Sequence, residues 1–187
     1  MIVAVKDRDR VLFAFSAFDT VYPVTVEDMA NPENAGVWKV KGNPHTVMGC
    51  MFPSAETDAF KYADKLFWGD INYDTLTDFT VPAMERYAEG KDYIGDDKDR
   101  YEELLIAQDG KLFKITSERL VLEADSYDVI SNGVDEFVKS VMQATEGEPP
   151  MDRIRKAFEF SAAVRQSNCY PLLVMDTETR KIRTLKR

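Results

Sequence analysis

Short apolar runs that come in pairs around polar turns constrain the fold of this chain most. The clearest pair covers residues 103–107 and 111–116, with Asp109-Gly110 between them. Asp-Gly between two apolar runs is the strongest short-range signal of a β-hairpin. Further pairs occupy residues 2–5 with 11–15, 37–41 with 46–52, and 170–175 with 181–185. Several runs are apolar at consecutive positions, which predicts strands that are covered on both faces.

Helical periodicity appears twice, each time between such pairs. We expect helices over residues 54–67 and within 75–89, where Pro82 predicts either a kink or a helix that begins near it. Two more are expected after Asn132-Gly133 and from Pro149-Pro150. With two shorter strands at 120–122 and 127–130, the order is ββ-ββ-αα-ββ-αα-ββ. The pattern favours one α+β domain over residues 1–187, although other α+β arrangements, a single mixed sheet among them, stay open on pattern alone.

Composition excludes several classes of partner. The chain is 44% hydrophobic and 11% aromatic, which is typical of a folded protein. Its formal net charge of -9 argues against nucleic acid and anionic membranes. No apolar run approaches the roughly 20 residues of a membrane helix, and no secretory signal is apparent. Cys50 and Cys169 have no metal or redox spacing, so we expect reduced thiols and a cytoplasmic protein, with a single disulfide still open.

The order of elements and several short motifs together resemble a known family. The segments that carry the resemblance are Ile2-Val3-Ala4-Val5-Lys6, Val47-Met48-Gly49, Asp109-Gly110-Lys111-Leu112 and Tyr127-Asp128-Val129-Ile130-Ser131-Asn132-Gly133. They are similar to segments of the proteasome-type N-terminal-nucleophile hydrolases, which include proteasome subunits and the peptidase of a bacterial double-ring ATP-dependent protease. The resemblance implies a four-layer αββα sandwich of two antiparallel sheets between two helix pairs. It also implies a homo-oligomer, either a ring or a face-to-face dimer.

The chemistry of that family depends on its first residue. The nucleophile is an N-terminal threonine, serine or cysteine, and its own α-amine serves as general base. A lysine favours the neutral amine, an aspartate orients the lysine, and glycine N–H groups form the oxyanion hole. Here Met1 stands at the first position. We expect Met1 to be retained, because Ile2 is bulky and methionine removal requires a small second residue.

The other family positions give the candidate site residues. Ser16 aligns with the orienting aspartate, and Asp19 follows three residues later. Gly36 stands at the lysine position, with Lys39 three residues further on. The resemblance places Gly49 at the oxyanion hole and Ser131 at a glycine-serine-glycine motif that here reads Ser-Asn-Gly.

A nucleophile away from the N-terminus is a second hypothesis. Cys50 follows Gly49, and His45, the single histidine, lies in the turn of the same hairpin and is its candidate base. Ser16 is the other candidate nucleophile, although a satisfied strand hydroxyl explains it as well. The acidic residues within 96–99 lack the ligand spacing of a calcium loop, so we expect no metal and no cofactor.

Three functions follow from these observations. The first is a proteasome-like subunit without the catalytic threonine, which acts as a structural or binding member of a homo-oligomer and could hold a peptide. The alternative is an amide-bond hydrolase, threonine-peptidase-like or of another type, that uses Cys50 or Ser16 as its nucleophile. The third is an unrelated α+β protein with a small-molecule pocket.

Overall fold

Two five-stranded antiparallel sheets form the centre of the protein. The computed structural model describes residues 1–16, 37–39, 46–50, 69–83, 103–131 and 133–187. The helix expected over residues 54–67 lies outside these ranges. The α+β class predicted from the hairpin pairs is confirmed, and the alternative of a single mixed sheet is wrong.

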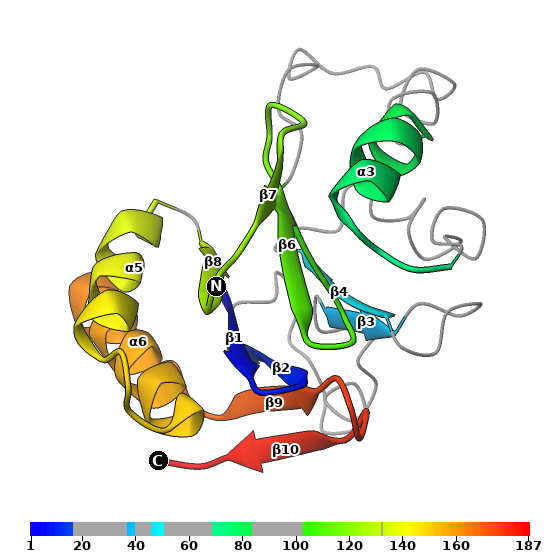
Figure 1. Cartoon of the computed structure of the whole chain (residues 1–187). Coiled ribbons are helices and arrows are strands. Elements are labelled where there is room, and N and C mark those ends of the chain that lie inside the picture. The colour runs from blue at the N-terminus through cyan, green and yellow to red at the C-terminus, as the bar shows by residue number, and fades with distance from the viewer. Residues whose placement is uncertain (17–36, 40–45, 51–68, 84–102, 132) are drawn as a thin grey trace.

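The first sheet gathers strands from both ends of the chain. Its order is β10-β9-β2-β1-β8, and each adjacent pair is antiparallel. The strands are β1 (Ile2–Asp7), β2 (Arg10–Ser16), β8 (Tyr127–Ile130), β9 (Leu172–Asp176) and β10 (Ile182–Leu185). The hairpin β1–β2 therefore occupies the middle, with later strands on both sides of it (Figure 1).

The second sheet is a simple succession of neighbours, in the order β3-β4-β5-β6-β7. Its strands are β3 (Val37–Lys39), β4 (Thr46–Cys50), β5 (Leu104–Gln108), β6 (Lys111–Ile115) and β7 (Val121–Glu123). The Asp-Gly turn joins β5 to β6 as the sequence predicts, with both turn residues at positive φ. Such a turn matches the twist of the strands that flank it.

Side-chain alternation along β1 divides the interior into separate cores. Val3 and Val5 belong to a cluster under the C-terminal helices, whereas Ile2 and Ala4 belong to a cluster between the two sheets. A third cluster lies on the outer face of the second sheet, and Leu76 contributes to it. Because both faces of β1 are buried, its residues are apolar at successive positions.

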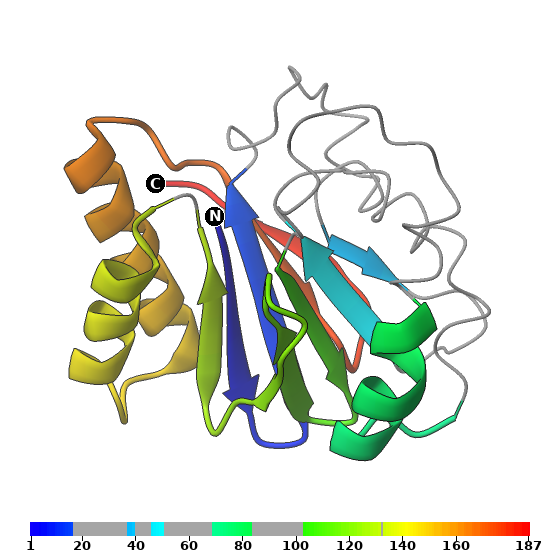
Figure 2. The same ribbon diagram turned by 90° about the horizontal axis from the view of Figure 1, so that it is seen from above.

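Helices α5 (Asp135–Ala144) and α6 (Pro150–Arg165) cover the outer face of the first sheet. Figure 2 shows this pair on one side of the sheets and α3 on the other. Proline is favoured in the first turn of a helix, which explains the start of α6 at Pro150. Arg153 joins the two helices, because its Nη2 donates to the carbonyl of Met142 at the end of α5 (2.8 Å). None of the described helices is long and apolar enough to cross a membrane.

The helix on the opposite side begins earlier than the sequence indicates. α3 (Tyr73–Thr75) starts with a capping box between Asn72 and Thr75 and leads into a π-helical stretch, η3 (Leu76–Thr80). Of the two alternatives for Pro82, a helix that begins near it is therefore wrong, whereas a kink stays a prediction. A proline lacks the N–H of a regular helical bond, and a π-helical turn precedes it here.

A buried glutamine attaches this helix to the second sheet. The amide nitrogen of Gln108 donates to the Thr46 hydroxyl (3.2 Å) and to the Gly69 carbonyl (3.1 Å). Its amide oxygen accepts the backbone N–H of Ile71. The segment that enters α3 is thus bonded to the ends of β4 and β5.

Two hairpin turns, one from each sheet, lie against each other. A Cβ on Gly110, in the β5–β6 turn, would lie 2.9 Å from the carbonyl carbon of Asp9 in the β1–β2 turn. Gly110 also has φ of +76°. Both its conformation and the proximity of another backbone therefore require glycine.

We predict that Gly110→Ala destabilises the protein more than Gly147→Ala. Gly147 also has a positive φ, but a Cβ added there would meet nothing within 4 Å, so its substitution isolates the conformational effect. We expect the Gly110 variant to lose roughly 1–3 kcal/mol more, because backbone atoms of Asp9 must move. Urea unfolding of both variants measures the difference, and equal losses would show that the two turns do not constrain each other.

Candidate functional site

Three of the positions to which the family assigns importance lie side by side at one end of the first sheet. Ile2 pairs with Phe15 on one side and with Ile130 on the other. One step further along these strands are Met1, Ser16 and Ser131. The fold therefore brings together segments that are more than a hundred residues apart in the sequence.

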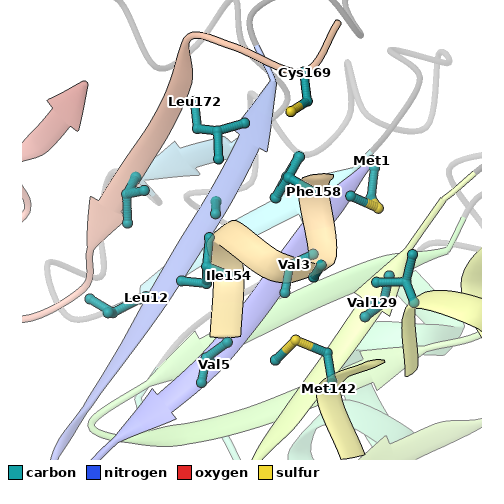
Figure 3. Packing of buried hydrophobic residues seen from close by; sticks show 14 of the residues in the cluster. Met1, Val3, Val5, Leu12, Val129, Met142, Ile154, Phe158, Cys169 and Leu172 are labelled. Carbon is teal, nitrogen blue, oxygen red and sulfur yellow. The ribbon is translucent and has the colours of Figure 1, made fainter. Parts of the chain in front are cut away.

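The side chain of Met1 points away from the space between the sheets. Met1 is 2% exposed and belongs to the helix-facing cluster, which also contains Val129 and Phe158. Figure 3 shows Met1 near Phe158 of α6. Its neighbour Ile2 takes the opposite direction and packs between the sheets. A thioether in this setting fills an apolar core and provides no nucleophile.

Ser16 also lies on the helix-facing side. It pairs with Leu172, which belongs to the same cluster as Met1, whereas the preceding Phe15 packs between the sheets. Directly paired residues of an antiparallel sheet share a face. The family alignment suggests that Ser16 faces the cleft between the sheets, but the register places its side chain on the other face of the first sheet. Ser16 is 2% exposed, and a substrate would have to enter the helix–sheet core to reach its hydroxyl.

The hydroxyl of Ser131 takes part in the start of α5. It donates to Oδ2 of Asp135 (3.0 Å) and accepts the backbone N–H of Val134 (3.1 Å). The other oxygen of Asp135 accepts the N–H of Ser131 (2.6 Å). These bonds satisfy polar groups at the beginning of a helix, which is a structural role.

Gly49 lies in β4 and faces the core between the sheets. A Cβ at this position would meet Cδ1 of Ile2 and Cδ1 of Phe13, both at 3.3 Å. Side chains of the first sheet thus fill the space beside this glycine. Close packing of the two sheets is thus a sufficient reason for a glycine at this position. An oxyanion hole is not needed to explain it.

The remaining candidates are only partly within the described structure. Asp19 and His45 lie outside the described residues, and so does the acidic segment 96–99. The backbone of Lys39 pairs with Val47, and that of Cys50 pairs with Leu104, but their side chains lie outside the described part. Within that part, no three His, Cys, Asp or Glu residues form a group suited to a metal ion.

The buried Lys114 was not anticipated from the sequence. Its Nζ lies 2.8 Å from a carboxylate oxygen of Glu103 and donates to the Val129 carbonyl on the other sheet (3.1 Å). The interruption of the apolar run Leu112-Phe113-Lys114-Ile115 was the available signal. With its ammonium engaged by an anion and a carbonyl, Lys114 joins the two sheets.

Tyr170 is a titratable group of the helix-facing cluster, and its pKa is clearly shifted. Burial, together with a hydrogen bond from its hydroxyl to Glu159 (2.8 Å), raises the pKa of Tyr170 to about 12. The phenol therefore keeps its proton at neutral pH and acts as a donor. It does not supply a base for Ser16 or for the terminus.

Comparison with solved structures identifies the fold. BPH of Thiobacillus denitrificans, solved in complex with epoxomicin, matches with a TM-score of 0.63 and 15% identity over 94% of this chain and 96% of that chain. Anbu, an ancestral β-subunit from Yersinia bercovieri, matches with a TM-score of 0.61 and 16% identity over 100% of this chain and 87% of that one.

Eukaryotic HslV from Trypanosoma brucei gives a TM-score of 0.56 and 16% identity over 94% of this chain and 97% of that one. No family model matches the chain, and no curated protein sequence matches it. At such low identity the likeness concerns the fold, which is that of the proteasome-like N-terminal-nucleophile hydrolases. The resemblance inferred from sequence is confirmed at that level.

We predict that Gly49→Ala and Ile2→Val compensate for one another. The alanine crowds Cδ1 of Ile2, and we expect it to cost roughly 1–3 kcal/mol of unfolding free energy. Valine at position 2 removes that Cδ1, so the double variant should lose at least about 0.5 kcal/mol less than the sum of the single losses. Chemical denaturation gives the unfolding free energy of the unmodified protein, the two single variants and the double variant.

Ile154→Val supplies the matched control. Ile154 is buried in the helix-facing cluster, away from Gly49, so its effect should simply add to that of Gly49→Ala. If the losses of unfolding free energy from Gly49→Ala and Ile2→Val also simply add, packing against Ile2 is not the reason for a glycine at position 49.

Proposed function

We propose that this chain, built on the proteasome-like fold, is a non-catalytic subunit of a homo-oligomer, with a structural or binding role. The observation that carries the proposal is the placement of Met1, whose side chain is 2% exposed in the helix-facing core. In the family, the first side chain has to present a hydroxyl or thiol to the substrate. Here that position holds a thioether turned toward α6.

The surroundings of Met1 support the same proposal. Ile2 and Phe13 fill the space beside Gly49. The hydroxyl of Ser131 is bonded to the start of α5. A covalent mechanism needs nucleophile, base and oxyanion donors around one reacting atom, and no such set converges among the side chains that the structure describes.

Exposed apolar side chains support association between copies. Phe137 on α5 is 59% exposed, and Phe160 and Val164 on α6 are 38% and 50% exposed. Large apolar side chains gathered on one outer helix layer favour contact with another protein surface. We take a second copy as the partner, since one of the similar structures is itself named a β-subunit. A cytoplasmic setting and a peptide ligand remain part of the proposal on the sequence grounds given above.

The hydrolase alternative now rests on Cys50. Ser16 is buried on the helix-facing side, so the observations do not favour it as a nucleophile. No described contact favours Cys50. Mass spectrometry with an inhibitor and a peptide-cleavage assay together separate the two functions.

We predict that the protein shows no added mass after incubation with epoxomicin, the ligand in the similar Thiobacillus denitrificans structure. That protein serves as the positive control in the same native mass spectra. Denaturing spectra should show an intact Met1, and native spectra should show multiples of the 21.3 kDa subunit. Because Met1, Ser16 and Ser131 present no nucleophile to the space between the sheets, we also expect no cleavage of peptide substrates.

Four results would contradict this proposal. A chain trimmed to a new threonine, serine or cysteine terminus, or a mass increase equal to one epoxomicin, would restore catalysis at the terminus. Peptide cleavage that disappears in Cys50→Ala would establish the hydrolase alternative instead. A monomer at all concentrations would remove the homo-oligomer.

A further inference from the structure

The two sheets expose edge strands on opposite flanks of the molecule. β10 ends the first sheet, and β7 ends the second. β8, at the other end of the first sheet, contacts β5 and β6, so the flank of β8 is also the flank of β7. Figure 1 shows β7 at the top of the view and β10 at the bottom. Among the described strands, each of these two has a single neighbour.

The β10 edge is strongly basic. Residues 180–187 contain five of the 24 basic side chains and no acidic one, although the chain as a whole has a net charge of -9. Lys181, Arg183 and Lys186 are exposed. The turn before β10 is held in place by the buried Asp176, which binds Nη1 of Arg10 (2.7 Å). The strand that carries the basic side chains is therefore held in position.

The β7 edge combines exposed leucines with carboxylates. Leu120 and Leu122 are 59% and 48% exposed, on the side opposite to the buried Val121. Glu118 and Glu123 beside them are exposed too. A hydrogen bond from its own backbone amide is the main cause that lowers the pKa of Glu118, so this carboxylate is ionised at neutral pH. Arg119 is the one cation of this short segment.

The neighbouring edge on the same flank is closed. The N–H of Val129 in β8 donates to Oδ1 of Asp128 (2.7 Å), and its carbonyl accepts from Lys114 (3.1 Å). Side chains therefore satisfy outward backbone groups that another strand would need. On this flank, β7 offers both the strand edge and the apolar surface.

We propose that the β10 edge of one copy packs against the β7 edge of the next copy. Two β10 edges repel each other, and so do two β7 edges, whereas the unlike edges attract. The aliphatic stems of Lys181 and Arg183 can cover Leu120 and Leu122 while their charged ends reach the glutamates. Such a contact joins different surfaces, so it repeats head to tail and closes into a ring when the rotation permits.

This inference rests on the homo-oligomer proposed above, and charge reversal tests it in the full chain. The first variant carries Lys181→Glu with Arg183→Glu, and the second carries Glu118→Lys with Glu123→Lys. Each places like charges across the contact, so we expect self-association to weaken roughly 100-fold or more. Native mass spectrometry and light scattering measure the assembly, while thermal unfolding verifies that both variants fold.

Mixing the two reversed variants should restore assembly, because each reversed edge then meets an edge of opposite sign. The variant that carries all four substitutions should assemble alone for the same reason. Arg8→Glu with Lys111→Glu is the control of equal charge change, since Arg8 is exposed in the β1–β2 turn and Lys111 is exposed at the start of β6, before the residues that pair with β7. We expect this control to assemble as the unmodified protein does.

The outcomes separate the two proposals. If the unmodified protein is monomeric at every concentration, the homo-oligomer and the edge contact both fail. If it assembles and the reversed variants assemble equally well, the edge contact fails and the homo-oligomer stands. If the variants dissociate and neither mixing nor the fourfold variant restores assembly, charge pairing between these edges is excluded.

Discussion

The close contact between the two sheets is the constraint on which the rest of this structure depends. The side chains of Ile2 and Phe13 pack closely against Gly49, which has no side chain of its own. The backbone of Gly110 lies beside the backbone of Asp9. Lys114 adds a polar link from β6 to the carbonyl of Val129. One face of each sheet packs against the other sheet, and helices pack on the outer faces. The strands are therefore apolar on both faces.

The same contact determines which side chains lie beside Gly49. Close packing requires bulky side chains of the first sheet opposite Gly49, at the place where the family alignment puts an oxyanion hole. The alternation that turns Ile2 inward turns Met1 and Ser16 outward to the helices. The side chains of Met1 and Ser16 therefore lie on the opposite face of the first sheet from the core that contains Ile2 and contacts Gly49.

Much of the fold could be predicted because its signals are local. Asp109-Gly110 fixes one hairpin, and continuous apolar runs indicate strands buried on both sides. The direction of Ser16 depends instead on its pairing with Leu172, which lies 156 residues further along the sequence, and no local pattern reveals such a register. The early start of α3 depends on Asn72 and Thr75, a capping box outside the usual Glu or Gln pattern. Lys114 was visible as a charge in an apolar run, but its two partners come from tertiary structure.

The alternation along β1 has a consequence for how this protein varies in evolution. Val3 and Val5 share a core with α5 and α6, whereas Ile2 and Ala4 share one with β4 and β5. Adjacent positions of β1 thus pack against different parts of the chain. Substitutions at positions 3 and 5 should covary with residues of α5 and α6, and those at positions 2 and 4 with residues of β4 and β5. Both faces are apolar, so hydrophobicity alone hardly opposes a slip by one residue. The sizes of Ala4 and Gly49 and the length of the β1–β2 turn preserve the register, and the contact between Asp9 and Gly110 leaves that turn little room for insertions.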